Sequence, residues 1–173
     1  MFESKPSRNA IWAAVVALVW IGLLVGVSLL ATPVKFRAPT LELPVALDVG
    51  RHTFSVFIIV EFVGLALLAL AIFIGARSRM MLAGLLVIVA VLSIQSVWLL
   101  PALDARVETY LAGEVPPDSM LHMFYVAAEG VKLLALIFIS TLSLRRALGS
   151  NERILPASKT LSAVSTHGTG LRL

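Results

Sequence analysis

The chain has 173 residues, of which 59% are apolar and only 14% are charged, and its mean hydropathy is +0.97. A soluble domain has about one quarter charged residues and needs them to cover its surface, so this composition indicates a protein that lies in a lipid bilayer. The sequence has no cysteine, which excludes disulfides, thiolate metal sites and thiol catalysis. The net charge of +4 does not predict nucleic-acid binding, because most of the charges flank apolar segments.

Four apolar segments are long enough to cross a membrane as α-helices, which requires roughly 20 apolar residues. In chain order the predicted spans are residues 11–32, 52–76, 80–100 and 119–144. Each run is continuous, whereas the strands of a membrane barrel alternate apolar and polar residues. The predicted fold class is therefore all-α, an integral membrane four-helix bundle. The first span is longer than the apolar core of a secretory signal, and we interpret it as a retained anchor.

The distribution of lysine and arginine predicts how the chain is oriented. Residues 1–10, the short connection 77–79 and the tail 145–173 are basic, whereas the connections 33–51 and 101–118 are less so. Basic segments stay on the cytoplasmic side of a membrane. We therefore predict a bacterial-type inner-membrane protein with both termini in the cytoplasm. The tail is polar and rich in serine and threonine, which predicts disorder.

The second half of the sequence resembles the first. When the sequence is aligned with itself so that Asp48 falls on Asp118, His52 falls on His122. Several apolar residues align at the same offset. The matching histidines are informative because the chain has only three. We interpret the pattern as a 2+2 duplicated helical hairpin with a pseudo-two-fold axis along the membrane normal. The two copies are the hairpins of residues 11–76 and 80–144.

The repeat creates two Asp-x-x-x-His pairs, Asp48 with His52 and Asp118 with His122. Four residues apart on a helix, a carboxylate and an imidazole lie on one face. If the second and fourth helices adjoin, the pairs meet at the outer end of the bundle. They are then candidate ligands for a divalent metal, or the histidines for a haem iron. The alternative is that each aspartate caps its helix beside an interfacial histidine.

Four polar residues fall deep inside the predicted spans: Glu61, Gln95, Glu129 and Lys132. Inserting an ionisable group at that depth costs about 2.5–3.5 kcal/mol of free energy, so such a group is expected to pair with another polar group or to serve the function of the protein. Glu61 and Lys132 lie roughly 13 and 15 Å below the histidines near the start of their spans. Because these depths in the membrane are similar, we predict that the two side chains form an ion pair. Gln95 is expected beside a neutral, protonated Glu129. The cluster functions either as a clamp between helices or, through Glu129, as a proton or cation site.

Short motifs in the outer connections resemble a known group. They are Pro33-Val-Lys-Phe36, then Trp98-Leu-Leu-Pro101-Ala-Leu-Asp-Ala-Arg106, and Leu121-His122. This pattern resembles the small four-helix membrane proteins of a domain-of-unknown-function group, the transmembrane-protein-205-like group. The resemblance implies the same topology but no established chemistry. The sequence departs from that group after the helix-four histidine, where Glu129 and Lys132 occur.

These observations predict a non-enzymatic protein, because no nucleophile and base are visible as a pair. We interpret it as an accessory or assembly subunit of a membrane complex, surrounded by lipid and either homo-oligomeric or bound to a membrane partner, with no nucleic-acid ligand. One alternative is a metal- or haem-binding protein. The other is a small proton- or cation-coupled transporter that uses Glu129. Close helix packing is expected through Gly22, Gly26, Gly64 and Gly84.

Overall fold

The computed structural model of the protein describes residues 6–152, and nearly all of them are helical. In chain order the elements are α1 (Pro6–Leu24), η1 (Val25–Ala31), α2 (Thr32–Lys35), α3 (Leu43–Ala71), η2 (Ile72–Ala76), α4 (Arg79–Ile94), η3 (Gln95–Leu99), α5 (Leu100–Leu111) and α6 (Leu121–Glu152). The three η elements are π-helical segments that continue the preceding α-helix.

These elements join into four long helices that are apolar enough to cross a membrane: Asn9–Lys35, Leu43–Gly75, Arg79–Leu111 and Leu121–Leu148. They have 27 to 33 residues each, which at about 1.5 Å per residue gives roughly 40–50 Å, more than a hydrocarbon core of about 30 Å. The helix ends therefore extend to the level of the lipid headgroups. The described residues form an all-helical bundle with four helices able to cross a membrane, which confirms the all-α, four-helix membrane part of the predicted fold class.

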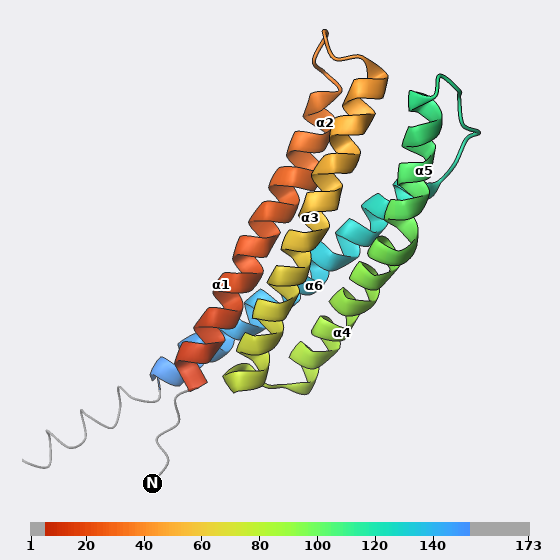
Figure 1. Ribbon diagram of the computed structural model, residues 1–173. Helices are drawn as coiled ribbons and strands as arrows, with labels where there is room; N and C mark the ends of the chain where they lie inside the picture. The colour runs from red at the N-terminus through yellow and green to blue at the C-terminus, as the bar shows by residue number, and fades with distance from the viewer. Residues whose placement is uncertain (1–5, 153–173) are drawn as a thin grey trace, which may run out of the picture.

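The four helices form a bundle with α1 between α3 and α6, and α4 on the other side of the same two helices (Figure 1). α3 and α6 thus lie across the bundle from each other, and α5 lies against α3. The described ends of α1 and α6 lie at the end of the bundle that holds the short 77–78 connection. We call the opposite end, with connections 36–42 and 112–120, the mouth.

The helices extend further toward the mouth than the predicted spans. The second helix begins at Leu43 rather than His52, and the third continues past Leu100 to Leu111. The connections predicted at 33–51 and 101–118 are consequently much shorter. In the tail, α6 continues to Glu152 rather than ending at residue 144, and the rest of the predicted disordered tail lies outside the described residues.

Prolines explain why the sequence suggested shorter spans. Pro33 and Pro101 each follow a π-helical segment and occupy the second position of a new α-helical stretch. A proline lacks an N–H and crowds the preceding turn, and a π-helical turn just before it relieves that conflict. The hydroxyl of Thr32 also donates a hydrogen bond of 2.8 Å to the carbonyl oxygen of Val27. The helix therefore continues through each proline.

Alanines, more than glycines, bring the helices together. α1 presents a buried stripe of Ala10, Ala13, Ala14 and Ala17, and its main neighbour is α6. Small side chains let helix backbones approach closely in lipid. The predicted role of glycine is correct at two of four positions. A Cβ on Gly64 or Gly84 would lie 3.1 Å from Trp20 or 3.0 Å from Ile139, whereas one on Gly22 or Gly26 would meet nothing within 4 Å.

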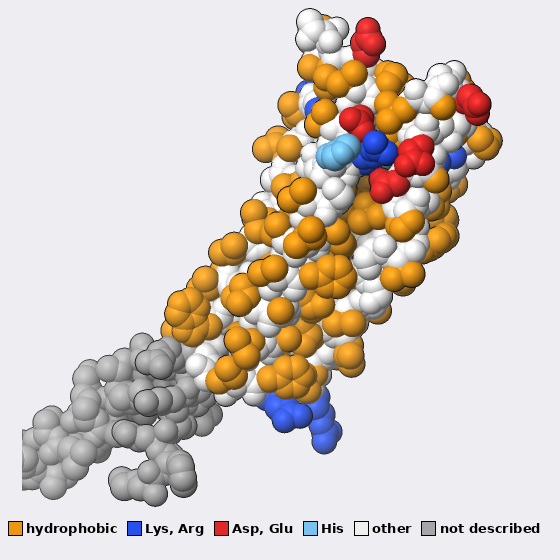
Figure 2. All heavy atoms as spheres, in the orientation of Figure 1, with side chains coloured by type: hydrophobic (Ala, Val, Ile, Leu, Met, Phe, Trp, Pro, Cys, Tyr) orange, Lys and Arg blue, Asp and Glu red, His pale blue; other side chains and the backbone are white. Residues whose placement is uncertain are grey.

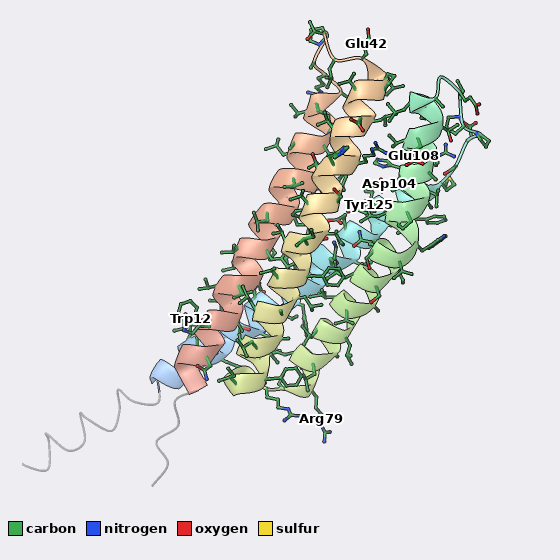
Figure 3. All side chains as sticks on the ribbon, viewed as in Figure 1. Trp12, Glu42, Arg79, Asp104, Glu108 and Tyr125 are labelled. Carbon is green, nitrogen blue, oxygen red and sulfur yellow. The ribbon has the colours of Figure 1, made fainter. Side chains whose placement is uncertain are left out.

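The outer surface divides into three zones along the bundle. Apolar side chains cover its middle, as expected for contact with lipid chains (Figure 2). Acidic and basic side chains gather near the mouth, and a basic patch lies at the other end, where Arg79 projects (Figures 2 and 3). The uncharged middle zone is the part that fits a hydrocarbon core. Whether the two hairpins arose by duplication stays a prediction.

We expect Gly84→Leu to weaken the bundle by about 1–3 kcal/mol, because the added side chain collides with Ile139 across the α4–α6 interface. Chemical unfolding in mild detergent, followed by circular dichroism, measures the change. Gly22→Leu is the matched control, since the same substitution there meets open space. Equal loss of stability in both variants would contradict the role assigned to Gly84.

Candidate functional site

A cluster of charges lies at the centre of the bundle. Glu61, Gln95 and Lys132 have no exposed surface, and Glu129 is only 2% exposed. Glu61 comes from α3, Gln95 from the first turn of η3, and the other two from α6. All four residues predicted as an intramembrane polar cluster are therefore brought together. Their level is near the middle of the helices.

Lys132 is the centre of this cluster. Its ammonium contacts Oε1 of Glu61 and lies 2.9 Å from Oε1 of Glu129. The predicted ion pair between Glu61 and Lys132 is present, and a second carboxyl group shares the same cation. Because α3 and α6 lie across the bundle from each other, this pair ties together two helices that otherwise pack little. Glu129, one turn before Lys132, completes the pairing from the same helix.

Three further donors surround the carboxyl groups. Trp20 Nε1 donates to Glu61 Oε1 at 3.3 Å, Gln95 Nε2 donates to Glu129 Oε1 at 2.9 Å, and Ser28 Oγ donates to Glu129 Oε2 at 3.3 Å. The predicted contact between Gln95 and Glu129 is present, with the amide as donor. The neutral, protonated state expected of Glu129 from the sequence stays a prediction. Every helix of the bundle thus contributes to the cluster.

Trp20 and Ser28 were not predicted as members of the cluster. The only signal in the sequence was the depth of Trp20 in its span, because a buried indole N–H usually finds an acceptor. Serine is common in membrane helices, and Ser28 lies in the π-helical segment η1, whose altered turn changes the direction of the side chain. Such a rotation cannot be read from spacing along a regular helix.

The Asp-x-x-x-His pairs do not cap helices. α3 begins at Leu43, so Asp48 lies more than a turn inside it and accepts a 2.8 Å hydrogen bond from Arg51. His52 Nδ1 lies 3.0 Å from the backbone oxygen of Asp48. At the start of α6, Ser119 rather than Asp118 accepts from a backbone N–H, that of Leu121. The capping alternative is therefore wrong for both aspartates.

Nor does the structure group the two pairs as a metal centre. Their helices, α3 and α6, lie across the bundle from each other and do not pack side by side as the prediction required. Within residues 6–152, no three His, Cys, Asp or Glu side chains lie close enough together to hold a metal ion. Both histidines are exposed, and His122 also lines an open cavity at the mouth. The metal or haem hypothesis for Asp48, His52, Asp118 and His122 gains no support from this arrangement.

Two adjoining cavities enter the bundle at the mouth. The first, about 210 Å³, lies between α2, α3, α5 and α6, and its lining includes Lys35, Arg51, Asp104 and Arg106. The second, about 290 Å³, extends deeper and is lined by Ser28 and Glu129. Both are lined by Thr32, Phe36, Phe54, His122 and Tyr125. We call the pair the mouth cavity. It extends from the headgroup level to the edge of the charge cluster.

Ion pairs close one side of the mouth cavity. Arg51 contacts Asp48 at 2.8 Å on its own helix and reaches Glu108 of α5 at 3.6 Å. Asp104 and Glu108 lie on α5 toward the mouth, and Tyr125 lies below them (Figure 3). Deeper in, the rings of Phe54 and Tyr125 meet edge to face at 5.2 Å between centroids. This aromatic pair bridges α3 and α6 above the charge cluster.

Comparison with known proteins adds no relative. The chain matches no protein-family model, no curated protein and no solved structure. Its resemblance to the transmembrane-protein-205-like group therefore stays a prediction, and its function must be argued from the site itself.

We expect Lys132→Met to destabilise the protein by about 3–5 kcal/mol, because the substitution leaves two carboxyl groups buried without a cation. Unfolding in mild detergent measures the loss. The double variant Lys132→Met/Glu61→Leu removes both members of the cross-bundle pair and should be less destabilised than the single variant. A double variant that is less stable than Lys132→Met alone would contradict this account.

Proposed function

We propose that the protein is a non-enzymatic inner-membrane protein that serves as an accessory or assembly subunit of a membrane complex. The observation that carries this proposal is the position of Lys132 between two buried carboxyl groups, with donors from every helix around them. Such a network fixes the helices relative to one another. A rigid helical scaffold with a lipid-facing exterior fits a subunit that supports a complex better than one that changes shape during a reaction cycle.

The charge distribution supports cytoplasmic termini. Exposed Arg77 lies in the short connection and exposed Arg79 begins α4, at the same end of the bundle as the described ends of α1 and α6 (Figure 1). Arg145 and Arg146 of α6 are close to that end as well. The mouth, in contrast, carries acidic side chains beside its basic ones. Because basic ends stay in the cytoplasm, the mouth faces the opposite side.

The accessory role predicts a stoichiometric partner. We expect the tagged chain, expressed at its native level and purified in mild detergent, to migrate on native gels with a second membrane polypeptide in a constant ratio. Cross-linking followed by mass spectrometry identifies that polypeptide and its contact residues. A second tag on another copy of the chain distinguishes a homo-oligomer. Recovery of monomers alone, or only of copies of this chain, would contradict the accessory role.

A second candidate function, proton- or cation-coupled transport through Glu129, is favoured by one observation. The mouth cavity reaches the carboxyl group of Glu129. The buried cluster also contains two carboxyl groups and one ammonium, and it is neutral only when it holds one proton or a further cation. The cluster is thus suited to take up a cation from the mouth.

Transport is tested with the protein in liposomes under a potassium diffusion potential, with a pH-sensitive dye inside. On this second candidate, wild-type protein carries a proton flux above that of empty liposomes, and Glu129→Gln lowers it at least tenfold because the titrating group is lost. Glu108→Gln, at the mouth and mostly exposed, is the matched control and should keep the flux. Equal flux in wild type and Glu129→Gln, or none in wild type, would remove the candidate.

A further inference from the structure

The walls of the mouth cavity carry more positive than negative charge. Three cationic side chains line its outer part, Lys35, Arg51 and Arg106, against one carboxylate, Asp104. Arg51 is already neutralised by its contacts with the carboxylates of α3 and α5. Among the described residues, neither Lys35 nor Arg106 has a carboxylate within ion-pair distance. Two half-buried cations, Lys35 and Arg106, therefore face the same space, and the one carboxylate in its lining, Asp104, lies outside ion-pair distance of both.

The ammonium of Lys35 lies directly over Gly50 of α3. A Cβ at position 50 would displace this flexible end of the lysine side chain. The same ammonium lies 5.0 Å from the centre of the Phe36 ring. Glycine at position 50 thus leaves room for a cation between α2 and α3. A charge held there, at the edge of an apolar interior, gains free energy when an anion joins it.

Most of the remaining lining is apolar, although Ser28 and Glu129 lie at the deep end. The cavity walls are formed mainly by Phe36, Leu47, Phe54, Leu100, Leu103 and Val107. Toward the charge cluster, the deeper part adds Leu29, Pro33 and Val126. A small water-soluble anion would leave these walls unused. A ligand that fills the cavity needs an anionic head for the cations and an apolar chain for the deeper part.

We propose that the mouth cavity binds an amphiphile with one anionic head group, a carboxylate or a phosphate, and an acyl chain. The head group lies between Lys35 and Arg106 at the headgroup level of the membrane. The chain passes Phe36 and Phe54 into the deeper cavity. A free fatty acid and an anionic phospholipid share this chemistry, and both can enter from the lipid around the bundle. This site is independent of the proposed accessory role, which depends on the charge cluster below it.

The test is native mass spectrometry of the full-length, delipidated protein in a neutral detergent. The probes are palmitate, palmitoyl lysophosphatidate and dipalmitoyl phosphatidate, with hexadecanol as the uncharged analogue of palmitate. We expect one molecule of at least one anionic probe to bind per chain, and hexadecanol to bind at least tenfold more weakly. Palmitate alone binding identifies a fatty-acid site, whereas binding of the phosphate lipids identifies a phospholipid site. Equal binding of hexadecanol would overturn the proposal.

Substitutions distinguish the effect of the cationic charges on binding from the effect of where the Lys35 ammonium lies. Lys35→Gln and Arg106→Gln should each weaken binding of the anionic probe about tenfold, which corresponds to the loss of one charge-assisted contact. Lys35→Arg should retain most of the affinity. Gly50→Ala keeps every charge but displaces the ammonium, and it should weaken binding as well. Arg37→Gln removes an exposed cation two residues from Lys35, outside the cavity lining, and should have no effect.

Circular dichroism first establishes that each variant is folded. With folded protein, unchanged affinity in both Lys35→Gln and Arg106→Gln would overturn the proposal. The same loss in Arg37→Gln as in Lys35→Gln would also overturn it, because binding would then reflect the general charge of the surface. The outcome does not depend on whether a partner polypeptide is found, so the site and the accessory role fail separately.

Discussion

A charged side chain in the middle of a membrane bundle must be neutralised by groups that other helices bring to it, and Lys132 imposes this requirement here. Its ammonium has three donors and no exposure to solvent. Glu61 must therefore approach from across the bundle, while Glu129 supplies the second carboxyl group from the same helix. An arrangement that separated α3 from α6 would leave charges in lipid at a cost of several kcal/mol. The cluster thus selects one packing of the four helices.

The packing of α1 makes this arrangement possible. Its alanine stripe, which includes Ala13 and Ala17, lets the helix pack closely against its neighbours. Trp20 can then place its indole against Gly64 and donate to Glu61. Small and large residues on one face of α1 therefore have different tasks: the alanines set the distance between the helices, and the tryptophan completes the polar contacts of the cluster.

Toward the mouth, the requirement that charged side chains be neutralised by other residues of the bundle is weaker. Above the aromatic pair of Phe54 and Tyr125, the helices enclose a cavity rather than a packed core. The cationic groups there are held at the headgroup level, where lipid headgroups and water can reach them, so they need no internal partner of the kind that Lys132 needs. The bundle therefore combines a closed interior with an open, basic and amphipathic end. This contrast is the reason to look for a ligand at the mouth and for a structural role in the cluster below it.

The sequence alone determined the class of protein, the number of membrane-crossing helices and four of the residues in the charge cluster, Glu61, Gln95, Glu129 and Lys132. Depth along a membrane helix follows directly from the rise per residue, so the matching depths of Glu61 and Lys132 predicted their contact.

The neighbours of each helix and the rotation of each side chain were decided only by tertiary packing. For that reason the sequence placed Asp48 and Asp118 at helix caps or a shared site, and missed both Trp20 at the cluster and the unpaired Lys35 and Arg106 at the mouth. The continuation of helix through Pro33 and Pro101 also depended on three-dimensional structure, because π-helical turns have no clear sequence pattern. A one-dimensional pattern fixes height in the membrane, whereas the direction in which a side chain points depends on how the helices pack.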